Sequence, residues 1–103
     1  MPSQVLACDL TALSDVERER HQQVARQVLD LKQSVCDLPD GYALQYPDEL
    51  QMYLLIAEFM SLEHRCCPFF HLALDVEPDQ KAIWLKIGGS AEIKAFARAE
   101  MLS

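Results

Sequence analysis

Apolar and polar residues alternate at the start of the chain. Over residues 4 to 10, QVLACDL, the side chains of Leu6, Cys8 and Leu10 fall on one face, because successive side chains of a strand point to opposite faces. The pattern predicts a first strand, with Cys8 directed toward the core.

The next segment has helical spacing. Ser14 is followed by acidic residues, which the helix dipole favours in a first turn, so we expect a helix to begin here. Its apolar face repeats at intervals of three and four residues through His21, Val24, Val28, Leu31 and Val35. His21 is therefore expected on the buried side of this helix.

Two hairpins are predicted further along. The first joins residues 35 to 38 to residues 42 to 46 through a Pro-Asp-Gly turn. The second joins residues 69 to 76 to residues 82 to 87 through the turn EPDQK. In the last strand the alternation places Ile83, Leu85 and Ile87 inward and Trp84 and Lys86 outward.

Two more helices complete the pattern. Residues 49 to 66 are strong helix formers with apolar side chains on more than one face, as is typical of a central helix, and Pro68 ends it. Residues 91 to 102 follow an expected N-cap at Ser90. The order β-α-β-β-α-β-β-α predicts an α+β fold, an antiparallel sheet with helices packed on one face, as a ferredoxin-like variant.

Length, composition and charge narrow the class of protein. A chain of 103 residues, half of them apolar, is expected to form a single domain over residues 1 to 103. The formal net charge of −7, with scattered basic residues, argues against nucleic acid as a direct partner. The sequence has no signal-peptide pattern and no apolar run long enough to span a bilayer, so we expect a cytoplasmic protein with no membrane partner.

The adjacent cysteines Cys66 and Cys67 are the main chemical feature. The chain has four cysteines, and outside small secreted domains such thiols are expected to be reduced. Adjacent cysteines rarely bond to each other, but two thiolates can hold a soft metal ion such as mercury, cadmium, zinc or copper(I), or a small thiophilic ligand. The additional donors are Cys8, Cys36, His21, His64 and His71.

The position of Cys66 and Cys67 at the end of a helix favours metal binding over a role as a free nucleophile. A helix C-terminus carries partial negative charge, which opposes thiolate formation at Cys66 and Cys67, whereas a bound cation supplies compensating charge. An enzyme in which Cys67 is a nucleophile and His64 or His71 its base is less favoured, because no nucleophile-elbow motif accompanies them. We therefore expect a metal site of Cys66, Cys67, Cys8 and His21, with Glu63 outside the ligand set orienting a ligand.

A bland interpretation stays open beside this one. Cysteine is among the most often buried residue types, so CCPFF is also compatible with a helix end that fills the core. The chain would then be a non-catalytic module with structural cysteines that binds a small molecule or a protein partner. That interaction would use the cavity between helices and sheet or the outward strand face of Phe69, His71 and Trp84. In both interpretations we expect a homodimer, for which this face is the candidate interface.

The chain also resembles a group of small bacterial proteins and appended domains. The resemblance is carried by five segments: ACDLTAL (7 to 13), ERERH (17 to 21), LPDGYA (38 to 43), EHRCCPFF (63 to 70) and IWLKIGG (83 to 89). Similar CC-x-FF segments look like those beside or fused to MerR-type metal-responsive regulators. The resemblance implies sensing or sequestration of a thiophilic metal, with matching polar positions at Cys8, Arg20, His21, Glu63, Cys66 and Cys67.

Overall fold

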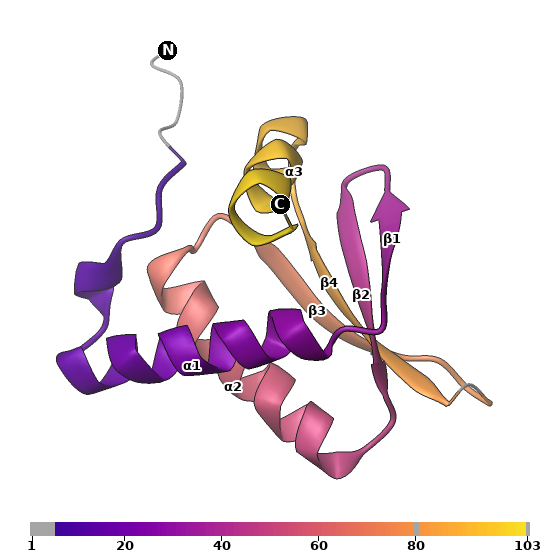
Figure 1. The fold of residues 1–103 in the computed structure, drawn as a ribbon. Coiled ribbons are helices and arrows are strands. Elements are labelled where there is room, and N and C mark those ends of the chain that lie inside the picture. Colours follow the sequence, from indigo (N-terminus) through magenta and orange to yellow (C-terminus); the bar gives the residue numbers. More distant parts are fainter. Residues whose placement is uncertain (1–5, 80, 103) are drawn as a thin grey trace.

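The computed structural model describes residues 6 to 79 and 81 to 102. Its elements are a short 3-10 helix η1 (Leu10–Ala12), α1 (Asp15–Leu31), β1 (Ser34–Leu38), β2 (Gly41–Pro47), α2 (Leu50–Cys66), β3 (His71–Val76), β4 (Ala82–Gly88), α3 (Ala91–Ala97) and a π-helical turn η2 (Arg98–Leu102). The α+β fold is confirmed, because helices pack against one antiparallel sheet (Figure 1).

The sheet has the strand order β1-β2-β4-β3, and each neighbouring pair is antiparallel. Strands β2 and β3 therefore run parallel to each other with β4 between them, so β2-α2-β3 is the split β-α-β unit of ferredoxin-like folds. The strand beside β2 comes from the preceding hairpin, β1, rather than from the end of the chain. This reordering is the sense in which the fold is a ferredoxin-like variant.

The expected first strand is not part of this sheet. Residues 6 to 9 have no regular secondary structure, and residues 10 to 12 form η1; residues 4 and 5 lie outside the described residues. The Asp9 side chain accepts a hydrogen bond from the Thr11 backbone N–H, which caps η1 and turns the chain. An Asp placed for capping thus prevails over a short alternation of apolar residues.

Helix α1 begins where the sequence predicts. Ser14 and Glu17 form a reciprocal capping box, each side chain accepting from the other residue's backbone N–H. Val24 and Val28 on its apolar face are fully buried, and Val28 accepts a hydrogen bond from the buried Tyr46 hydroxyl of β2. The helix ends at Leu31, which is half exposed, so the apolar face is shorter than the sequence pattern indicates.

One face of the sheet forms the core. The inward residues of β2 and β4 lie opposite one another in register, Tyr42 with Ile87, Leu44 with Leu85 and Tyr46 with Ile83, and all six are buried. Helix α3 contacts β2 and β4 on this side and lays Lys94 over the Tyr42 ring. Trp84 and Lys86 face the other way, as predicted. The helices thus cover one face and leave the other uncovered.

Phe69 lies on the covered side. It precedes β3, and its ring contacts those of Phe70 and Phe96, with centroids 4.8 and 5.3 Å away. His71 and Trp84, by contrast, have strand positions on the uncovered face. The expected interface of Phe69, His71 and Trp84 is therefore wrong for Phe69, because Pro68 ends the helix in a turn that directs this ring toward α3.

Candidate metal centre

The end of α2 supplies three of the five predicted residues. Glu63, Cys66 and Cys67 are spaced at i, i+3 and i+4, a spacing that places them on one side of a helix. Cys67 is the C-cap, and its backbone N–H donates to the Glu63 carbonyl over 2.7 Å. Pro68 cannot extend the helix, so this last turn presents both cysteines and Glu63 at its end.

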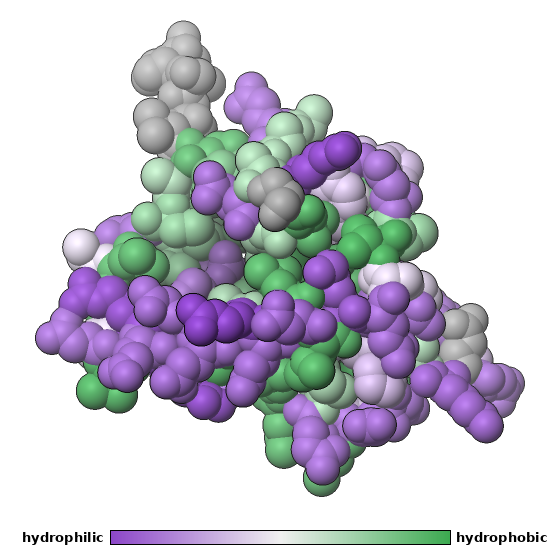
Figure 2. Space-filling view, viewed as in Figure 1, coloured by the Kyte–Doolittle hydropathy of each residue, from purple (hydrophilic) through white to green (hydrophobic). Residues whose placement is uncertain are grey.

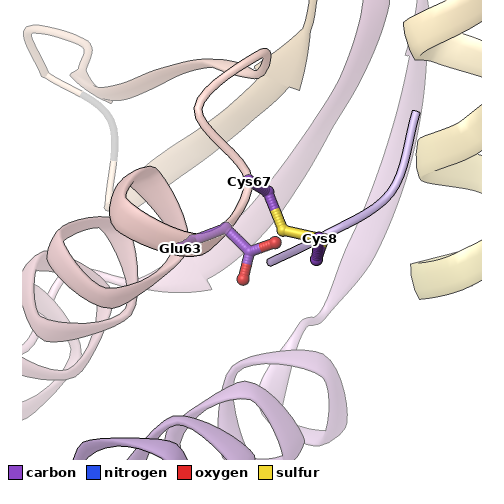
Figure 3. Close-up of side chains that lie close together, drawn as sticks. All are labelled: Cys8, Glu63 and Cys67. Atoms are coloured by element: carbon purple, nitrogen blue, oxygen red, sulfur yellow. A yellow bond between two sulfur atoms is a disulfide. The ribbon is translucent and has the colours of Figure 1, made fainter. Parts of the chain in front are cut away.

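The N-terminal segment brings Cys8 to this helix end. The Asp9 backbone N–H donates to the Cys66 carbonyl over 2.7 Å, one of the carbonyls that a helix terminus leaves without a partner inside the helix. Cys8 is joined to Cys67 by a disulfide, and the Glu63 carboxylate lies beside the bond (Figure 3). The expectation that all four thiols are reduced is thus wrong for Cys8 and Cys67.

Helix α1 supplies the fifth residue. His21 Nε2 lies 2.6 Å from Glu63 Oε2 and 3.8 Å from Cys66 Sγ, and the imidazole stacks on the Phe59 ring with centroids 6.5 Å apart. Two ion pairs join α1 to α2. The Arg20 guanidinium donates one hydrogen bond of 2.7 Å to each Glu58 carboxylate oxygen, and Arg65 pairs with Glu17. The position of His21 is therefore set by contacts along the whole helix pair.

Burial controls the protonation of the free thiol. Cys66 is fully buried, and this burial, together with the nearby Glu63 carboxylate, raises the pKa of its thiol from 9.0 to about 11. Cys66 is thus a neutral thiol near pH 7. His21 offers the same nitrogen to both Cys66 and Glu63, so the three do not form a relay in which a carboxylate orients the second nitrogen of a catalytic base.

Two separations around Cys66 are suited to a soft metal, whereas Cys8 and Cys67 are bonded to each other in this structure. Cys66 Sγ lies 3.6 Å from Cys67 Sγ and 3.8 Å from His21 Nε2. Donors of a tetrahedral site with metal–sulfur bonds of about 2.3 Å are roughly 3.8 Å apart. Two groups of three residues have ligand atoms that all lie within 4.8 Å of one another. The first donor set is Cys8, Glu63 and Cys67, and the second is His21, Glu63 and Cys66, so Glu63 belongs to both. Glu63 is central to the cluster rather than at its margin, where the sequence analysis placed it.

The other candidate donors lie elsewhere. Cys36 is exposed on β1, His64 is exposed on α2, and His71 is exposed at the start of β3. None of these three belongs to a donor set found among the described residues. The structure thus brings together Cys8, His21, Glu63, Cys66 and Cys67. Sequence reasoning missed the bidentate Arg20–Glu58 pair, although Arg20 directly precedes His21.

Comparisons with protein-family models, with curated proteins and with solved structures find no match to this chain. Within the described residues, no helix has the length and apolar character required to cross a membrane. Fold and site together define a small α+β protein with a cluster of three cysteines, one histidine and one glutamate, in which Glu63, Cys66 and Cys67 are buried.

Proposed function

We propose that the reduced protein binds a soft metal ion through Cys66 and Cys67, with Cys8 and His21 as supporting ligands. The observation that supports this most strongly is that Cys8, His21 and Glu63, distant from one another in the sequence, converge on the cysteine pair within ligand distance. Thiolate and imidazole donors select zinc, copper(I), cadmium or mercury over hard cations. Glu63 supplies a negative charge beside the ion.

Metal binding releases protons from the cysteine ligands. Each thiol must lose its proton when a metal–sulfur bond forms, and at Cys66 the ion must provide the charge that the buried site otherwise lacks. The Glu63 carboxylate, 2.6 Å from His21 Nε2, is a proton acceptor within the cluster. Because Nε2 is also the nitrogen nearest Cys66, its contact with Glu63 must give way when His21 binds the metal.

In this proposal, the protein with the Cys8–Cys67 disulfide is the oxidised form and does not bind the metal ion. With Cys8 and Cys67 bonded to each other, two of the four ligands have no thiolate to offer. Reduction therefore precedes metal binding, and the location that we propose, the cytoplasm, supplies the reducing conditions that this step requires. The resemblance to segments associated with MerR-type regulators supports a role in metal sensing or sequestration.

The test is a titration of the phosphine-reduced protein with mercuric, cadmium, zinc and cuprous ions, followed by thiolate-to-metal absorbance. We expect saturation near one ion per chain, loss of binding in Cys66→Ser with Cys67→Ser, and no change in Cys36→Ser. Cys36→Ser is the matched control, because it removes an exposed thiol outside the cluster, whereas Cys8→Ser removes a supporting ligand and should weaken binding. Undiminished binding in the double variant would reject the site.

A second candidate function is favoured by the disulfide itself. If Cys8–Cys67 is a structural crosslink, the protein is a non-catalytic module that binds a small molecule or a protein partner. The uncovered sheet face, with Trp84 and His71, would carry that interaction, and pairing of two copies there would make a homodimer. Trp84→Ala would then shift the sedimentation coefficient toward that of a monomer while leaving metal titration unchanged.

A further inference from the structure

The cluster has one open side, formed by an apolar pocket of about 360 Å³. The pocket lies between the N-terminal segment, the end of α2 and the C-terminal helical turns, and Figure 2 shows the surface hollowed in this region, above α1. Its apolar lining comes from Leu6, Leu10, Phe70, Phe96 and Met101. Cys8 and Glu63 also line it, so the pocket reaches the donor cluster directly.

The pocket reaches only one of the two donor sets. Cys8 and Glu63 line it, and Cys67 is bonded to Cys8, whereas Cys66 and His21 do not line it. A ligand that enters here therefore meets the Cys8 sulfur first, and the Cys67 sulfur, which does not line the pocket, is bonded to it. Its other end remains among hydrocarbon side chains, where apolar area removed from water favours binding.

The charge at the pocket has one sign. Among the residues that the structure describes, Glu63 and Glu100 are the ionisable groups that line it, and no basic side chain does. An anionic ligand, such as an acidic thiol, would be repelled, whereas a cation with an apolar substituent matches both the charge and the lining.

We propose that the pocket accepts the hydrocarbon group of an organometal cation, a soft metal ion that already carries one metal–carbon bond, while Cys8 and Cys67 bind its metal. This inference rests on the proposed function and names its ligand class. Carbon occupies one coordination position of the metal, so the cation needs fewer protein ligands than a bare ion and can be held by the first donor set alone. The Cys8–Cys67 disulfide is first reduced to two thiols by a phosphine, which supplies two electrons and is oxidised with water to its phosphine oxide. On the reduced protein, the first metal–sulfur bond displaces the metal's single departing anion and the second thiolate adds to the metal. Each thiol releases its proton to solvent, and no electrons are transferred in this second stage.

The experiment compares phenylmercury and methylmercury cations on the phosphine-reduced Cys36→Ser protein. Each cation is partitioned between the protein and a small monothiol, which removes intrinsic differences in thiol affinity from the comparison. We expect the protein to prefer phenylmercury by about tenfold or more, because several additional carbon atoms leave water. Equal partition of the two cations would overturn the proposal, and this arm needs no change to the pocket.

Two variants then locate the preference. Leu10→Ser combined with Met101→Ser makes the pocket polar at partly or fully exposed positions and should lower the phenyl preference several-fold, whereas Leu54→Ser, on an exposed part of α2, should not. An unchanged preference in the folded double variant would also overturn the proposal. If the protein binds no mercuric ion, both proposals fail; if it binds mercuric ion at one per chain without a phenyl preference, only this one fails.

Discussion

Cys36 and Cys66 are both free thiols, yet the structure places them in opposite environments. Cys36 is exposed on the edge strand β1, and its thiol donates a weak hydrogen bond to the adjoining Asp37 carbonyl over 3.9 Å. Cys66 is fully buried among Cys67, His21 and Glu63. The comparison shows that the chemistry of a cysteine depends on which elements converge on it.

The largest expected effect is loss of the disulfide. Cys8→Ser removes a crosslink between residues 59 positions apart, which should lower the free energy of unfolding by about 4 kcal/mol under oxidising conditions. Cys36→Ser should change it by less than about 0.5 kcal/mol. Urea denaturation of both variants measures this contrast. Reduced wild type should match Cys8→Ser; equal stability of oxidised and reduced wild type would contradict the prediction.

A somewhat smaller loss of unfolding free energy is expected when the contact between His21 and Glu63 is broken. His21→Leu leaves the Glu63 carboxylate, 5% exposed, without its partner, and should cost about 3 kcal/mol of unfolding free energy. Adding Glu63→Met should recover much of that loss, because the uncompensated charge is removed. Chemical denaturation of the two single variants and the double variant completes the cycle. Additive losses would mean that the two side chains are not coupled.

The smallest expected effect is the dependence of stability on pH that arises from the Cys66 thiol. Because the pKa of the Cys66 thiol is raised to about 11, the folded protein holds this proton more tightly than the unfolded chain does. Cys66 therefore contributes stability that is fully present below about pH 9 and is lost as the pH rises through 11. Thiolate absorbance of a Cys36→Ser variant, with the disulfide intact, isolates this titration. A midpoint near 9 would show that the sulfur is solvated.

Local signals were sufficient for most of the fold. The Ser14 capping box, the Pro-Asp-Gly turn and the alternation around Trp84 each depend on neighbouring residues, and the corresponding elements form as predicted. The strand expected over residues 4 to 10 had only seven residues of alternation to support it. Capping by Asp9 and the link from Cys8 to Cys67 bring the chain instead to the end of α2.

The candidate site was predictable in its membership but not in its pairing. Cys66, Cys67 and Glu63 follow from helical spacing, and His21 follows from the apolar face of α1. Which of them touch depends on how far α1 slides along α2, and that register is set by long-range contacts such as Arg20 with Glu58. Neither the disulfide partner of Cys8 nor the contact of His21 with Glu63 is encoded in any short segment.

Residues 6 to 13 contribute no strand, and they meet the end of α2 through the Asp9 hydrogen bond to the Cys66 carbonyl and the Cys8–Cys67 disulfide. A protease that cut between Ala12 and Leu13 in the reduced protein would release Cys8 and leave the sheet, the three α-helices and four of the five clustered residues intact. Such a cleaved protein would bind the metal ion through an incomplete ligand set, which would be exposed where residues 6 to 12 had covered it.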